Sequence, residues 1–253
     1  MHSSSRMPSM KSAIVLGMAL FALPANAIVR GDRISDEIFA AEYSWMVAVV
    51  RQATGKICGG MLIAPRWVIT AAHCTSTDRY VLTGHASRWM ARTIDIARAI
   101  RHPQFEPDSG AYDIGLLELA EPADGAPIRP ASPRLGKLLL APDATATIAG
   151  WGKTQTSKGS VSRLVAAEIE LQKLNIRRSQ FGFNSRNGPC ARDSGGPLIM
   201  KGAGHSRVLL GIASRTAGNL CSTGGGRAFY ARVDAAHDFI SKYVAAAADA
   251  TER

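Results

Sequence analysis

Cysteine is scarce in this chain of 253 residues: there are four, and no two of them form a C-x-x-C pair. Cysteine-based zinc sites usually contain such pairs, so the spacing argues against a structural zinc site. The acidic residues likewise lack the spacing of a calcium-binding loop. We therefore expect no metal and no other cofactor.

Long apolar runs and internal repeats are also missing. One apolar run, at residues 13–23, follows Arg6 and Lys11 and is too short to span a bilayer. It is followed by Pro24-Ala25-Asn26-Ala27, whose A-x-A pattern is typical of a signal-peptide cleavage site. We expect residues 1–27 to be a signal peptide, so that the protein is secreted to a periplasm or out of the cell and has no stable membrane anchor.

Acidic residues are fewer than basic ones, and the formal net charge is +10 for the whole sequence. Residues 1–27 carry Arg6, Lys11 and no acid, so the charge without them is +8. Such a charge can attract acidic surfaces, although it is more often a solvated face. We expect no nucleic-acid partner. The sequence leaves the oligomeric state open, and a monomer is the expectation.

Helical periodicity is rare, whereas short β-branched runs separated by glycine and proline are common, which predicts an all-β fold. A proline-containing stretch at residues 120–133 is expected to connect two halves. One helix is predicted, at about residues 235–248, from apolar residues at helical spacing. The predicted strands are 46–50, 61–63, 67–70, 80–83, 93–97, 114–119, 145–149, 166–171, 197–200, 208–213 and 229–233.

Residues 190–197 read C-A-R-D-S-G-G-P and place Ser194 between Asp193 and a pair of glycines. Glycines let the backbone approach a ligand closely and leave N–H groups free to face it. A serine hydroxyl becomes a good nucleophile only beside a base that is oriented by a third group. This motif therefore predicts a nucleophile if the chain also supplies a histidine and an acid.

Both partners are present upstream. His73 follows the apolar, β-branched run 67–70 after two alanines, and Asp113 comes directly before a second apolar strand. Taken singly, each motif is often structural: a core histidine, a strand-start aspartate or a loop. The other five histidines lack a paired motif. The three motifs together favour a catalytic Ser-His-Asp arrangement of His73, Asp113 and Ser194.

Seven motifs, in order, resemble those of the trypsin and chymotrypsin-like serine proteases, and the likeness covers the chain from Ile28 to the C-terminal helix. The order His, Asp, Ser differs from that of α/β-hydrolases. The motifs are Ile28-Val-Arg-Gly31, Cys58-Gly-Gly60, Thr70-Ala-Ala-His-Cys74, Asp113-Ile-Gly-Leu-Leu117, Gly150-Trp-Gly152, Asp193-Ser-Gly-Gly-Pro197 and Tyr230-Ala-Arg-Val233.

The resemblance implies a chymotrypsin-like fold of two six-stranded antiparallel β-barrels, at 28–128 and 129–253, the second carrying a C-terminal helix. It implies a secreted serine endopeptidase acting on proteins or peptides through an acyl-enzyme. His73 would be the base, Asp113 would orient it, and the N–H groups of Ser194 and Arg192 would form the oxyanion hole. Arg192 departs from the family, which has glycine at that position.

The resemblance implies two further features. Cleavage after Ala27 would free the amino group of Ile28 to pair with Asp193. The four cysteines allow three pairings by sequence alone; the family pattern selects Cys58 with Cys74 and Cys190 with Cys221.

Four positions match the family's substrate pocket: Gly188, Ser214, Thr216 and Ala228. Gly188 replaces the aspartate of trypsin-like members, and the side chains of Thr216 and Ala228 shorten the pocket. We therefore expect a small apolar residue before the cleaved bond. Two alternatives stay open. Arg192, Arg215 and Arg227 would suit an acidic residue there, and a compromised oxyanion hole would make the chain a cationic binding protein instead of an efficient protease.

Overall fold

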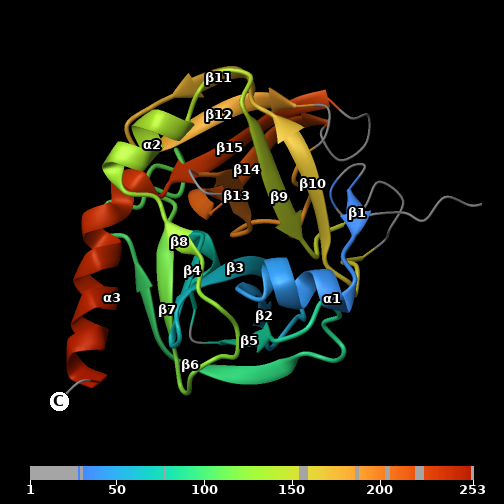
Figure 1. The fold of residues 1–253 in the computed structure, drawn as a ribbon, viewed down its shortest axis with the longest axis vertical. Coiled ribbons are helices and arrows are strands. Elements are labelled where there is room, and N and C mark those ends of the chain that lie inside the picture. Colours follow the sequence, from blue (N-terminus) through green and yellow to red (C-terminus); the bar gives the residue numbers. More distant parts are fainter. Residues whose placement is uncertain are drawn as a thin grey trace, which may run out of the picture.

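The computed structural model describes residues 28, 31–76, 78–153, 159–185, 188–202, 206–219 and 225–251. It has a closed six-stranded barrel, a nine-stranded sheet and a C-terminal helix (Figure 1). The predicted chymotrypsin-like fold class is confirmed. The proposed signal peptide and Cys221 lie outside the described residues, so the structure does not bear on either prediction.

The first half is an antiparallel barrel in the order β2-β3-β4-β7-β6-β5. Its strands are short and apolar, and residues such as Val47, Met61, Ile69 and Leu116 are fully buried inside it. The strands are β2 (Met46–Arg51), β3 (Ile57–Ala64), β4 (Trp67–Thr70), β5 (Arg79–Thr83), β6 (Arg92–Arg101) and β7 (Gly115–Leu119).

The second half is a sheet whose main path is β1-β10-β9-β13-β14-β15-β12-β11, with β8 pairing in parallel to β14. Among the described residues this path stays open, in contrast to the first barrel. Its strands are β1 (Asp32–Arg33), β8 (Arg129–Pro130), β9 (Thr145–Gly150), β10 (Val165–Glu170), β11 (Gln172–Ile176), β12 (Gln180–Ser185), β13 (Pro197–Lys201), β14 (Arg207–Asn219) and β15 (Gly225–Arg232).

The sequence predicted no strand between residues 171 and 190, where the structure has β11 and β12. Most of β11 is exposed, because it forms the edge of the sheet. Within it, Leu174 and Ile176 alternate with Lys173 and Asn175, which is a short strand pattern that the prediction missed. β12 is almost wholly buried, and in it Phe181 and Phe183 alternate with Gln180, Gly182 and Asn184, a second pattern that the prediction missed.

The prediction of a single helix was wrong, because the structure also has α2 (Pro133–Leu139) and the one-turn α1 (Asp36–Ile38). Ser132 caps α2 by accepting a hydrogen bond from Leu135 N, and Pro133 occupies its first turn. The remaining helical segments are α3 (His237–Thr251), the 3₁₀ turns η2 (Ala72–Cys74) and η4 (Asp234–Ala236), and the π-helical η1 (Phe39–Tyr43).

Helix α3 follows the second sheet in sequence but packs against the first barrel, beside β7 (Figure 1). Its Tyr243 ring lies 6.3 Å from Trp67 of β4, and its Phe239 ring lies 4.8 Å from His102. The C-terminal helix therefore links the two halves. No helix in the described part of the chain has the length and apolar character needed to cross a membrane.

Candidate active site

His73 and Asp113 are held together by two hydrogen bonds. His73 Nδ1 lies 2.8 Å from Asp113 Oδ2, and the backbone N–H of His73 donates to Oδ1 at 3.0 Å. An ionised carboxylate can only accept, so the pair places the imidazole proton on Nδ1 and leaves Nε2 as the acceptor. The side chain of Asp113 is 3% exposed and that of His73 is 40% exposed, so the ring faces solvent while its partner is buried.

Asp113 accepts a third hydrogen bond, from Ser214 Oγ at 2.6 Å. Burial disfavours the charged carboxylate, but the hydrogen bonds from His73 and Ser214 outweigh it and lower the pKa of Asp113. Ser214 belongs to β14, whereas Asp113 comes two residues before β7. The carboxylate is therefore fixed by both halves of the molecule.

The local backbone explains how these two side chains meet. Strand β4 runs directly into the 3₁₀ turn η2, which carries His73 at the end of the barrel. On the other side, Tyr112 has a left-handed backbone (φ 49°), and its ring stacks on His102 at 4.5 Å. This strained turn immediately precedes Asp113 and directs it toward η2.

Ser194 lies between the two halves, on a turn before β13. Its carbonyl accepts a hydrogen bond from Gly59 N of β3 at 2.8 Å, and Cys74 Sγ lies 3.9 Å from the same oxygen. Gly195 follows in a left-handed conformation (φ 79°), and a Cβ there would overlap Thr70 Oγ1. The turn therefore requires glycine at this point.

The three candidate catalytic residues are thus brought to one seam. Among the described residues, no hydrogen bond joins Ser194 Oγ to the imidazole of His73. Such contacts are often long in ligand-free proteins and shorten when substrate binds.

Arg192 has a left-handed backbone, with φ of 77°, and its Nη1 donates to Ser160 Oγ at 3.1 Å. A Cβ in this conformation costs about 1–2 kcal/mol. Within the described part of the chain, the N–H groups of Arg192 and Ser194 donate no hydrogen bond. Both donors are therefore free to receive a ligand oxygen.

Asp193 is 2% exposed, and backbone N–H groups of Gly152 and Cys190 donate to its two oxygens at 2.8 and 2.9 Å. Burial raises its pKa to about 7, although these N–H groups lower it. No cation of the described residues forms an ion pair with it. Ile28 is 1% exposed and packs in the core of the second half. This buried carboxylate therefore has no positive partner among the residues that the structure describes.

The predicted disulfide between Cys58 and Cys74 is confirmed, with an S–S distance of 1.96 Å. It ties β3 to η2, directly beside His73. Cys190 is also not a free thiol, while its predicted partner Cys221 is outside the described residues.

Cys58, His73 and Cys74 form the one group of close metal-ligand types in the described part of the chain, and the disulfide removes both of its thiolates.

A cavity of about 170 Å³ opens beside Ser194 and is also lined by Ser214, Arg215 and Thr216. Two other predicted pocket residues do not line it. Gly188 is buried and directly precedes Pro189, which lines the cavity. Ala228 is fully buried on β15, where it pairs with Thr216 of β14.

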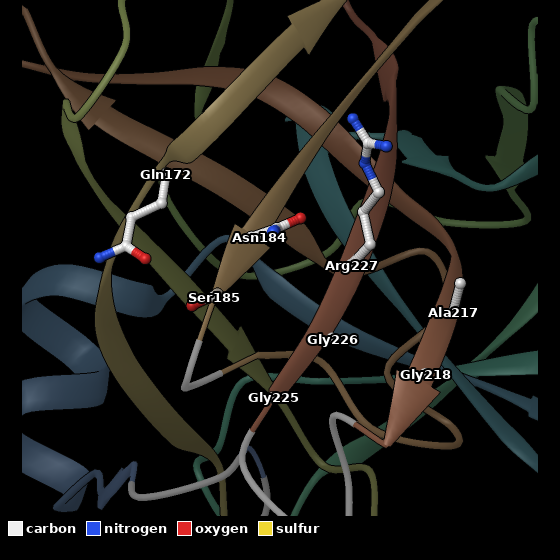
Figure 2. Close-up of a pocket in the computed structure, with 8 residues that line it drawn as sticks. All are labelled: Gln172, Asn184, Ser185, Ala217, Gly218, Gly225, Gly226 and Arg227. Atoms are coloured by element: carbon white, nitrogen blue, oxygen red, sulfur yellow. The ribbon is translucent and has the colours of Figure 1, made fainter.

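A larger opening of about 460 Å³ lies farther along β14 and β15, at Gly218, Gly225 and Gly226 (Figure 2). None of the three candidate catalytic residues lines it. The chemistry suggested by the motifs therefore belongs to the smaller cavity.

Comparison with known proteins agrees with this geometry. A sequence profile of the trypsin family matches residues 32–240. The chain is 28% identical to a trypsin of Saccharopolyspora erythraea over 82% of this chain and 95% of that protein. It is 32% identical to mouse cathepsin G over 70% of this chain and 73% of the relative, and 32% identical to human granzyme M over 70% and 76%.

The chain belongs to the trypsin family of serine proteases, and this membership supports peptidase activity in general.

Proposed function

We propose that the protein is a serine endopeptidase in which Ser194 is the nucleophile, His73 the general base and Asp113 the group that orients His73. The observation that carries the proposal is the chain of hydrogen bonds from Ser214 through Asp113 to His73, at 2.6 and 2.8 Å, beside the cavity at Ser194. The buried carboxylate holds the imidazole with Nε2 free to accept a proton.

The reaction follows from these roles. Ser194 Oγ attacks the peptide carbonyl while its proton passes to His73 Nε2, and a C–O bond forms. His73 then protonates the leaving amine as the C–N bond breaks, which leaves an acyl group on Ser194. A water molecule then attacks the acyl carbon while His73 takes its proton. The ester C–O bond to Ser194 breaks, the acid is released, and His73 returns the proton to Ser194 Oγ.

The N–H groups of Arg192 and Ser194 stabilise the oxyanion of both tetrahedral intermediates. Neither N–H group donates to another of the described residues, which supports this role. Loss of one such donor typically raises the barrier by about 2.7–4 kcal/mol.

The substrate carries a small apolar residue before the cleaved bond. The cavity at Ser194 is about 170 Å³, and Thr216 forms part of its wall. Gly188 offers no negative charge to a lysine or arginine of the substrate. Ser214 lines the same cavity, whereas Gly188 and Ala228 belong to this subsite by position rather than by direct lining.

The enzyme is exported, and removal of residues 1–27 gives its active form. The new amino group of Ile28 pairs with Asp193 and fixes the turn that carries Arg192 and Ser194. The unpaired, buried Asp193 supports this step, because losing one partner of a buried ion pair is strongly unfavourable. Signal removal then also serves as activation.

A peptide library incubated with the chain beginning at Ile28 tests the proposal. We expect cleavage after alanine, valine or similar residues, and loss of all cleavage in Ser194→Ala. Cleavage after arginine or lysine would overturn the specificity, and cleavage that survives in Ser194→Ala would overturn the mechanism.

The second candidate function is a cationic binding protein with little or no hydrolytic activity. The left-handed conformation of Arg192 favours it, since strain at this residue could misplace an oxyanion donor. The buried, hydrogen-bonded Asp113 and His73 favour the enzyme, because a binding protein has no use for this arrangement.

A further inference from the structure

Three arginines converge on a separate cavity of about 220 Å³ in the second half of the molecule. Arg177, Arg215 and Arg227 line it together with Gln180 and Phe229. Arg177 follows β11, while Arg215 and Arg227 lie on the neighbouring strands β14 and β15. Residues far apart in the sequence therefore bring three positive charges to one enclosed space.

The aromatic ring of Phe229 organises two of these arginines. The guanidinium carbon of Arg215 lies 4.8 Å from the ring centroid and that of Arg227 lies 5.6 Å from it. Arg215 is also held by a hydrogen bond from Nη1 to the carbonyl of Ser109. Cation–π packing of this kind fixes the orientation of an arginine without neutralising its charge.

Within the described part of the chain, no ion pair involves any of the three arginines, although six other arginines form one. Nε of Arg227 is buried and has no hydrogen-bond partner, and the same holds for Oε1 of Gln180. A buried donor without a partner is costly, and an acceptor brought by a ligand would remove the cost.

The three-arginine cavity and the cavity at Ser194 are adjacent and share a lining residue. Arg215 lines both this cavity and the one at Ser194, and it directly follows Ser214, which hydrogen-bonds Asp113. A peptide with one side chain in the cavity at Ser194 can therefore place a nearby side chain past Arg215.

We propose that this three-arginine cavity is a subsite for an acidic side chain of the substrate, a few residues before the cleaved bond. It rests on the proposed function, because it requires a peptide in the cleft. A carboxylate matches the guanidinium groups in charge and geometry and accepts the free N–H of Arg227. The amide of Gln180 can rotate to present its NH₂ group to the second oxygen.

The test uses peptide pairs that differ only in Asp against Asn, at each of four positions before the residue in the Ser194 cavity. Affinity is measured on Ser194→Ala, where no cleavage occurs, and kcat/KM on the active chain. At one position, we expect the Asp peptide to have about tenfold higher affinity and about tenfold higher kcat/KM than the Asn peptide. The preference should shrink in high salt.

Two variants assign the effect to the cavity. Arg227→Gln and the exposed Arg177→Gln should each reduce the Asp/Asn ratio toward one. Arg33→Gln is the matched control, because it removes the same charge from β1 at the opposite edge of the sheet. Its Asp/Asn ratio should equal that of the unaltered chain. Thermal unfolding of each variant shows whether it is folded.

The outcomes separate this subsite from the proposed function. Cleavage with equal rates for Asp and Asn peptides at every position would overturn the subsite but would not contradict the proposed protease activity. A preference that survives in both Arg177→Gln and Arg227→Gln would also overturn it. Tight binding of Asp peptides to Ser194→Ala without cleavage by the active chain would support the subsite and refute the protease. Absence of binding by any peptide would refute both.

Discussion

Ser214 Oγ donates to the same oxygen of Asp113, Oδ2, that lies 2.8 Å from His73 Nδ1. The serine comes from the second sheet, while the histidine and the aspartate come from the barrel. The orientation of the proposed base therefore depends on the docking of the two halves, and Ser214 contributes the contact of the second sheet with Asp113.

Ser214→Ala should lower kcat by about tenfold, because the charged carboxylate loses a hydrogen bond and holds His73 less firmly.

The pKa of Asp113 lies below its ordinary value of 3.8, so ionised Asp113 stabilises the fold above about pH 4, and this stabilisation is lost as the pH falls further. The loss of stability in Ser214→Ala should thus be largest at neutral pH and shrink in acid. Urea unfolding at several pH values measures it, with Ser241→Ala in α3 as control. An equal loss at all pH values would contradict the account.

Arg192→Gly should raise kcat several-fold, because glycine adopts a φ of 77° without strain and presents the same N–H group. Arg192→Ala is the control: it keeps the Cβ and its strain of about 1–2 kcal/mol, and it loses only the contact with Ser160. Steady-state hydrolysis of one peptide compares the variants. If both substitutions lower kcat equally, the guanidinium is what the site needs and the strain argument is wrong.

An additional glycine ahead of Ile28 should abolish most activity, because the amino group can no longer reach Asp193. In this extended form, the pKa of Asp193, about 7, lies above the ordinary 3.8, so the fold is favoured by the neutral carboxyl. That contribution is complete below about pH 4 and is lost as the pH rises through 7.

Urea unfolding measures the effect. The extended chain should lose several kcal/mol of stability between pH 4 and 8, whereas the chain beginning at Ile28 should not. Asp193→Asn in the extended chain should remove the pH dependence. Identical pH profiles for the two chain starts would show that no pairing with Ile28 occurs.

Thr216→Gly should widen the cavity at Ser194 and shift the preference before the cleaved bond from alanine toward phenylalanine. A change of roughly tenfold or more in the ratio of kcat/KM values is expected, since each methylene in such a pocket contributes about 1–3 kcal/mol. Thr216→Ser is the matched control and should change the ratio less. An unchanged ratio in Thr216→Gly would mean that another residue limits the pocket.

The sequence was most informative where chemistry demands particular residues in a fixed order. The motifs around His73, Asp113 and Ser194 predicted side chains that the structure brings to one seam, and the disulfide Cys58–Cys74 is present. The left-handed backbone at Arg192 was also foreseen in part, because glycine is usual there and arginine replaces it.

Features that depend on long-range packing could not be predicted in the same way. Two local signals were also missed: the short alternation of Leu174 and Ile176 with polar residues in β11, and the cap Ser132 with Pro133 at the start of α2. The family resemblance placed Arg215 and Arg227 near the cleft, but only the pairing of β14, β15 and β12 brings Arg177 to them. Charge gathered from distant strands leaves no local pattern.

Labelling with a fluorophosphonate probe tests the central claim, that Ser194 is made nucleophilic by His73 and Asp113, most directly. The chain beginning at Ile28 should be labelled at Ser194, more slowly in Asp113→Asn, and not measurably in His73→Ala or Ser194→Ala. Absence of labelling in the folded, unaltered chain, or equal labelling in His73→Ala, would contradict the claim and favour a binding protein.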